Sequence, residues 1–118
     1  MFVEAAIERC YEEVTSDGFI YKLAENFPAF AGHFEGYPLL PAVCQISFCV
    51  NAAGRLLQQP LEVKALKRAK FMSPVLPGAR IAVKLSKRPD GWYLAELTEV
   101  ESRKKLSQVI LQFSPRSL

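Results

Sequence analysis

His33, the only histidine of the chain, lies in the segment Gly32-His33-Phe34-Glu35-Gly36-Tyr37-Pro38-Leu39-Leu40-Pro41. Imidazole is the side chain whose unperturbed pKa lies closest to neutral pH, so it suits the removal and return of a proton. Glycine and proline residues shape the loop around His33, and a helix-patterned run follows directly. These residue types at the start of a helix predict a proton-transfer base. The helix itself carries no carboxylate that could work with this base.

The run from Pro41 to Leu57 is predicted to form one long helix, because apolar residues recur in steps of three and four. These residues are Val43, Ile46, Val50, Ala53 and Leu57. Proline suits the first helical position, and Gln58-Gln59-Pro60 ends the run. At 1.5 Å per residue the helix is about 25 Å long. Cys44, Phe48 and Cys49 widen its apolar surface, which predicts a mostly buried helix with both cysteines in the core.

The segments around this helix show the patterns of strands, turns and one apolar loop. Residues 6–14 fit either a helix or a strand, and Ser16-Asp17-Gly18 predicts a turn into a strand over residues 19–23. Residues 26–41 predict an irregular but packed loop, anchored by Phe30, Phe34 and Tyr37. Strands are predicted over residues 63–72, 81–86, 92–100 and 108–113, with Trp92 packing at a hairpin. The sequence therefore predicts one α+β domain over residues 1–118, an antiparallel sheet wrapped around a single helix.

Composition excludes several classes of protein. The chain has 118 residues, which is enough for one domain, and its net charge of +3 is too small for a typical nucleic-acid-binding protein. No apolar run is long enough to predict a membrane span, and the first residues lack the basic region of a secretory signal. Cys10, Cys44 and Cys49 show no metal-ligand spacing, so we expect free thiols in a reducing cytoplasm and no metal site.

Two motifs resemble the 3-hydroxyacyl-acyl-carrier-protein dehydratases of the hotdog fold. The first is Gly32-His33-Phe34-x-Gly36-x-Pro38-x-x-Pro41, and the second is Ala69-Lys70-Phe71-Met72-Ser73-Pro74-Val75-x-Pro77-Gly78. The run Leu40–Ile46 is also similar to the small dehydratase-like proteins of aryl polyene pathways. The resemblance implies a hotdog domain, at least dimeric, that removes water from a 3-hydroxyacyl chain to give the trans-2-enoyl thioester. The substrate would be attached to the phosphopantetheine arm of an acyl carrier protein, and no metal or further cofactor would be needed.

The resemblance also implies roles for individual residues. His33 maps to the family's catalytic histidine. The first N–H groups of the helix, near Ala42 and Val43, would hold the thioester oxygen as negative charge builds on it. The positions expected to bind substrate are Phe34, Gly36, Pro41, Ala42, Val43 and Asn51.

Ser47 is the main departure from the family pattern. Family members carry Glu or Asp fourteen residues after the histidine, on the helix of the neighbouring subunit, and this position is Ser47 here. A serine hydroxyl cannot serve as an ionisable acid, and we expect it to hydrogen-bond back along its own helix. The family's glutamine corresponds to Asn51, and its glycine after the second proline corresponds to Ala42, whose backbone N–H remains.

Three interpretations of Ser47 remain open. The protein still dehydrates with another group replacing the acid; Glu35 is the nearest candidate carboxylate, and Cys44 lies on the first turn of the helix. Alternatively, it forms half of a heterodimer in which a related hotdog subunit supplies the acid, rather than a homodimer. It could also bind acyl thioesters without chemistry. A hotdog thioesterase is a further alternative, but thioesterases of this fold commonly need a similar polar group.

Basic residues gather in the strand-patterned segment after the helix. Lys67, Arg68 and Lys70 are the residues expected to dock the carrier protein, which is acidic, through charge steering. The plainer interpretation is a solvated strand face.

Overall fold

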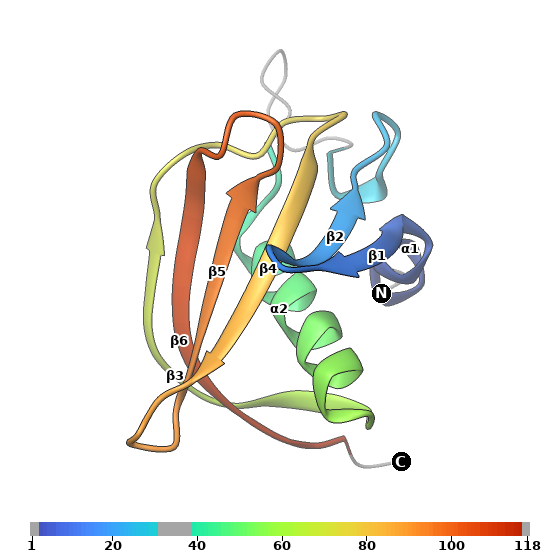
Figure 1. The fold of residues 1–118 in the computed structure, drawn as a ribbon. Helices are drawn as coiled ribbons and strands as arrows, with labels where there is room; N and C mark the ends of the chain where they lie inside the picture. Colours follow the sequence, from blue (N-terminus) through green and yellow to red (C-terminus); the bar gives the residue numbers. More distant parts are fainter. Residues whose placement is uncertain (1–2, 31–38, 117–118) are drawn as a thin grey trace.

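The computed structural model describes residues 3–30 and 39–116, which form an antiparallel sheet curved around one long helix (Figure 1). The helices are α1 (Val3–Cys10) and α2 (Ala42–Leu57), with a short 3-10 turn, η1, at Pro28–Phe30. The strands are β1 (Tyr11–Thr15), β2 (Gly18–Lys22), β3 (Leu61–Phe71), β4 (Arg80–Lys87), β5 (Tyr93–Glu99) and β6 (Lys105–Pro115). The predicted α+β architecture is confirmed.

The six strands form one sheet in the order β1-β2-β4-β5-β6-β3, and every neighbouring pair is antiparallel. The inner strands carry the core: Ile81 and Val83 of β4 and Leu97 of β5 are completely buried. Val83 lies opposite Phe19 on one side and Leu97 on the other. Alternating branched side chains pack well on a pleated surface, which explains why this part of the sheet was predictable.

Helix α2 buries only part of the predicted apolar surface: Ala53 is buried and Ile46 packs partly against the core. Cys44, Phe48, Cys49 and Ala52 face the sheet and are buried, whereas Val43 is 67% exposed and Leu57 is 38% exposed. Both faces of this helix are apolar, so periodicity alone could not tell which one the sheet covers. The predicted core positions of the two cysteines are confirmed, and the two ends of the stripe, Val43 and Leu57, stay exposed.

Helix α2 begins at Ala42 rather than at Pro41. Pro41 has extended backbone (φ −61°, ψ 151°) and is the N-cap residue, whose carbonyl accepts hydrogen bonds from the N–H groups of Cys44 and Gln45. Proline has no N–H, so Pro41 donates no backbone hydrogen bond whether it is the N-cap or the first helical residue. At the other end Gln58 takes a left-handed conformation (φ 56°), and the Gln59 N–H bonds to the Gly54 carbonyl at 3.1 Å.

The N-terminal segment, which fitted helix or strand, contains both. Helix α1 ends at Cys10 and β1 starts at Tyr11, and an eight-residue helix needs packing to be stable. This packing comes from the four side chains of α1 that face the core: Val3, Ala6, Ile7 and Cys10. The predicted turn at Ser16 and Asp17 is confirmed, and Gly18 follows it with φ 119°.

The apolar loop before α2 is packed down where the structure describes it. Phe27, Phe30 and Leu40 are buried, and the turn η1 gives the loop some regular structure. Trp92 lies in the turn before β5 and not in the strand. Within residues 3–30 and 39–116, no helix has both the length and the apolar character to cross a membrane.

Candidate active site

The two sequence motifs meet at the amino end of α2. The Leu40 N–H donates to the Val75 carbonyl at 2.9 Å, and both side chains are buried. The turn that follows Val75 is held to the residue after β2, because the Gly78 N–H bonds to the Leu23 carbonyl at 2.8 Å and the Leu23 N–H bonds to the Ala79 carbonyl at 2.8 Å. The end of the histidine loop is therefore fixed against the segment that carries the second motif.

Backbone donors lie where this loop enters the helix. The N–H groups of Ala42 and Val43 precede the first intrahelical hydrogen bond, which Cys44 makes to Pro41. N–H groups at this position point out of the helix and concentrate its positive dipole end. The predicted role of Ala42 and Val43 as donors to an oxyanion requires N–H groups in this arrangement, and the role itself stays a prediction. Val43 exposes its side chain, whereas Pro41 is half-buried.

Four of the expected site residues lie outside the residues that the structure describes. They are His33, Phe34, Glu35 and Gly36, and their predicted roles rest on the sequence motif.

Ser47 uses its hydroxyl within its own helix. Its Oγ donates to the Val43 carbonyl at 3.1 Å, as the sequence predicted. Ser47 also lines an open groove of about 740 Å³ beside α2, together with Asn51 and Arg55 of the same helix, Glu8 of α1, and Leu61 and Val63 of β3. The position of the family carboxylate therefore faces an open space large enough to receive groups from another molecule.

Asn51 is held in a polar network that the sequence did not reveal. Its Oδ1 accepts hydrogen bonds from the Tyr21 hydroxyl at 2.6 Å and from Arg55 Nε at 3.1 Å, and its Nδ2 donates to Glu8 Oε1 at 2.8 Å. Arg55 also pairs with Glu8 at 2.7 Å and lies 3.5 Å from the centre of the Tyr11 ring. Asn51 thus has established partners in this chain, and a substrate that used its amide would have to share them.

Glu8 is the carboxylate that sequence reasoning missed in this groove. The sequence signal was poor, because Glu8 lies 39 positions before Ser47 in a segment that could be helix or strand. Its two oxygens face Asn51 and Arg55. Both oxygens of this carboxylate are therefore engaged by partners within the chain.

Gln45 is a second polar residue that the sequence analysis passed over. It is buried on the first turns of α2, and its Nε2 donates to the Leu40 carbonyl at 3.3 Å. Its Oε1 has no partner among the described residues. This hydrogen bond links the end of the histidine loop to helix α2.

The cysteines are free and buried. Burial raises the pKa of the thiols of Cys10 and Cys44, and it raises the pKa of Cys49 to about 12. Thiols held in the neutral form are weak nucleophiles and weak metal ligands. Across the described residues, no group of three His, Cys, Asp or Glu side chains is arranged to hold a metal ion.

The expected carrier-docking residues lie on β3 at the edge of the sheet. Lys67 contacts its own chain: its Nζ is 3.7 Å from Asp90 Oδ2 and 5.3 Å from the centre of the Trp92 ring. Trp92 therefore packs under a lysine, at the β4–β5 turn. Arg68 and Lys70 are exposed.

A curved antiparallel sheet around one buried helix, with the histidine motif leading into that helix, defines a hotdog-fold domain of the dehydratase type. The chain belongs to the ApeI-like family (ApeI dehydratase), whose family model matches residues 12–108. The resemblance drawn from the two motifs is thereby confirmed.

Individual relatives agree with this assignment. The chain is 37% identical over 67 residues to the 3-hydroxyacyl-[acyl-carrier-protein] dehydratase FabZ of Haemophilus influenzae, a match that covers 50% of this chain and 45% of that protein. The match thus spans about half the length of this curated relative. Among solved structures, the dehydratase heterocomplex ApeI:P from Xenorhabdus doucetiae matches with a TM-score of 0.70 at 24% identity, covering 83% of this chain and 85% of that chain. The E. coli PaaI protein matches with a TM-score of 0.64 at 13% identity, over 97% of this chain and 89% of that chain. The two structural matches show the fold.

Proposed function

We propose that this protein takes part in the dehydration of a 3-hydroxyacyl thioester carried by an acyl carrier protein, giving the trans-2-enoyl thioester. The observation that supports this proposal is the hydrogen bond between Leu40 and Val75, which joins the two dehydratase motifs at the start of α2. The family assignment supports the reaction type. The phosphopantetheine arm would enter as part of the substrate, and the reaction needs no other cofactor. A cytoplasmic location fits the three free thiols.

The proposed chemistry begins with His33, which removes a proton from the carbon next to the thioester. Negative charge then develops on the thioester oxygen, and the N–H groups of Ala42 and Val43 stabilise it as fixed donors. The 3-hydroxyl leaves as water after it receives a proton. This last step is where a second acid is normally required, and Ser47 cannot provide it.

The structure favours a half-site, in which this chain supplies the histidine and another subunit supplies the acid. The hydroxyl of Ser47 bonds to Val43, and the carboxylate of Glu8 in the same groove is engaged by Arg55 and Asn51. We therefore propose that the acid for the site around His33 comes from a related hotdog subunit. The reciprocal site, which would contain Ser47, would lack its acid. The dehydratase ApeI:P from Xenorhabdus doucetiae, which shares the fold, is a heterocomplex.

Three other interpretations stay open to experiment. Glu35 acting as the acid within this chain, and acyl-thioester binding without turnover, both remain predictions. A thioesterase is a further alternative, and it would release free thiol where a dehydratase forms an enoyl thioester.

The test is an assay with a 3-hydroxyacyl-carrier protein, following the enoyl thioester, on the chain in complex with an acid-bearing hotdog subunit, because the half-site proposal leaves the chain alone without its acid. We expect His33→Ala to lower turnover by about 100-fold or more with an unchanged melting temperature, as for loss of a general base. Glu35→Gln is the matched control in the same loop: an equal loss there would favour Glu35 as the acid. Unchanged turnover in His33→Ala would rule out the base role.

Docking of the carrier on Lys67, Arg68 and Lys70 remains a prediction. Charge reversal at Arg68 and Lys70 should raise the KM for the carrier-bound substrate at low salt more than at high salt.

A further inference from the structure

The open groove that contains Ser47 runs along one face of α2. Its lining residues on this helix recur at helical spacing, from Ser47 through Val50, Asn51, Gly54 and Arg55 to Gln58. Eight positions separate Ser47 from Arg55, which is about 12 Å along the helix axis. An extended chain that started beside Ser47 could therefore lie along the helix and reach the level of Arg55.

The guanidinium of Arg55 is held in one orientation in this groove. Its Nε donates to Asn51 Oδ1 at 3.1 Å, and its Nη2 donates to Glu8 Oε2 at 2.7 Å. Its central carbon lies 3.5 Å from the centre of the Tyr11 ring, so one face of the planar group is covered. A group fixed by these contacts loses little further freedom when it binds a ligand.

Arg55 keeps hydrogen-bond donors that its own chain does not use. A guanidinium has five N–H bonds, and the contacts with Asn51 and Glu8 involve Nε and Nη2. Nη1 has no acceptor among residues 3–30 and 39–116. The side chain of Arg55 is 25% exposed and lines the groove, so a ligand oxygen can reach it. A hydrogen bond from a guanidinium is about twice as strong as one between neutral groups.

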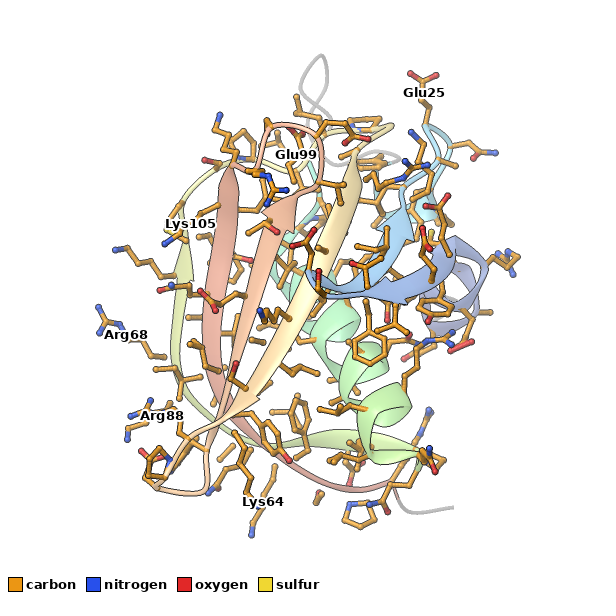
Figure 2. The ribbon with its side chains drawn as sticks, viewed as in Figure 1. Glu25, Lys64, Arg68, Arg88, Glu99 and Lys105 are labelled. Carbon is orange, nitrogen blue, oxygen red and sulfur yellow. The ribbon has the colours of Figure 1, made fainter. Side chains whose placement is uncertain are left out.

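The charges around the groove favour a neutral ligand oxygen over an anionic one. The lining includes three carboxylates against two guanidinium groups: Glu4, Glu8 and Glu62 against Arg55 and Arg116. Lys64 of β3 does not add to these cations, because it projects away from the body of the protein (Figure 2). An anionic tail would meet this excess of negative charge, and a purely apolar tail would displace water from Arg55 without replacing its hydrogen bonds. A neutral acceptor such as an ether, ketone or hydroxyl oxygen has neither cost.

We propose that this groove binds an acyl chain that carries a neutral oxygen acceptor toward its far end, and that Arg55 is the residue that recognises this oxygen. Ser47 supplies no acid, so the groove binds the chain without dehydrating it. An extended chain advances about 1.2 Å per bond, and an arginine side chain leans toward the amino end of its helix. The oxygen is therefore expected about six to ten bonds from the atom beside Ser47. The inference deepens the proposed function, on which it relies for the acyl nature of the ligand.

Binding of stable substrate analogues to the full chain tests the inference without turnover. The analogues are 3-hydroxyacyl pantetheine amides of equal chain length, in which nitrogen replaces the thioester sulfur. The distal ether has an oxygen about eight bonds beyond the carbon that bears the 3-hydroxyl, and the alkyl analogue has a methylene group there. The proximal ether has its oxygen about four bonds nearer to the amide. Calorimetric titration gives the Kd of each analogue.

We expect wild type to bind the distal ether about tenfold more tightly than the alkyl analogue or the proximal ether, because one hydrogen bond from a charged donor is gained. Arg55→Met should remove this preference. Arg116→Met is the matched control, because it removes the other guanidinium of the groove, and it should keep the preference.

Equal binding of the distal ether and the alkyl analogue by wild type would overturn the inference, and so would a lack of binding of all three analogues. A preference that survives in Arg55→Met, or that disappears in Arg116→Met, would assign the recognition to another residue and overturn it as well. If the melting curve of Arg55→Met shows that this variant does not fold, the wild-type comparison of the distal and proximal ethers decides alone. Dehydration is followed separately in the enoyl assay, so failure of the proposed function is recognised independently of these binding results.

Discussion

The hydroxyl of Tyr21 donates a 2.6 Å hydrogen bond to Oδ1 of Asn51, which joins the inner face of β2 to the open face of α2. Tyr21 is fully buried, and burial raises the pKa of its hydroxyl although Arg55 lowers it. The bond ends at a residue in the groove that also contains Ser47. Stability of the domain and the shape of its candidate site are therefore linked through Asn51.

Asn51→Leu should lower the free energy of unfolding by about 1–3 kcal/mol, because it leaves the buried Tyr21 hydroxyl without its acceptor. Urea denaturation measures this loss. In the double variant Tyr21→Phe, Asn51→Leu the combined cost should be smaller than the sum of the single costs. Strictly additive costs would show that the bond contributes little. Glu8→Gln serves as control and should cost under about 1 kcal/mol, since the Glu8 side chain is mostly exposed.

Ser47→Glu should increase dehydration by the purified chain by about tenfold or more, because it returns a carboxylate to the position the family uses. The glutamate would lose the bond of Ser47 to Val43 but would extend into the groove. Turnover of a 3-hydroxyacyl-carrier protein is the measurement. Ser47→Gln matches the size without the acid and should not raise turnover. Equal rates in the two variants would indicate that the missing carboxylate does not limit the protein.

Stability should fall as the pH rises above about 9, partly through Cys49. The ordinary thiol pKa of 9.0 applies to the unfolded chain, and burial raises the pKa of Cys49 to about 12 in the folded chain. The unfolded thiol therefore ionises first, and stability falls by about 1.4 kcal/mol per pH unit between these values. Below pH 9 this contribution is complete. Urea denaturation at pH 8 and pH 10.5 measures it.

Cys49→Ala provides the comparison for this pH effect. Its absolute stability will differ, because the side chain is smaller, but the fall between pH 8 and pH 10.5 should be shallower than in wild type. Parallel falls in the two proteins would assign the effect to other groups, such as lysines.

Gly18→Ala should destabilise the domain by about 3 kcal/mol or more, because two costs combine. The residue has φ 119°, and an added Cβ would collide with the carbonyl oxygen of Val83 and lie 2.7 Å from its carbonyl carbon. Backbone atoms of an inner strand cannot move aside easily. Gly91→Ala is the matched control: φ is 88° there and no atom lies within 4 Å, so about 1 kcal/mol is expected. Thermal unfolding of both variants compares them, and similar losses would contradict the role of Val83.

Local patterns explain which parts of the fold were predictable. The turn at Arg88–Trp92 was expected from Pro89-Asp90-Gly91, and the structure closes it with Arg88 N–H to Trp92 carbonyl at 2.7 Å. The back-bond of Ser47 was expected as well, because it depends on residues four apart on one helix. The division of the N-terminal segment at Cys10 and Tyr11 was not predictable, since it depends on a core assembled from distant residues.

The sequence by itself determined the family, the long helix, the strand pattern and the absence of a carboxylate at position 47. Each depends on residue types and their spacing along the chain. Tertiary structure alone decided that α2 buries Cys44, Phe48 and Cys49 while Val43 stays exposed, that Glu8 and Arg55 enclose Asn51, and that the cationic segment forms the open edge β3. Periodicity shows which residues share a face, but contacts between residues far apart in the chain decide which face is covered.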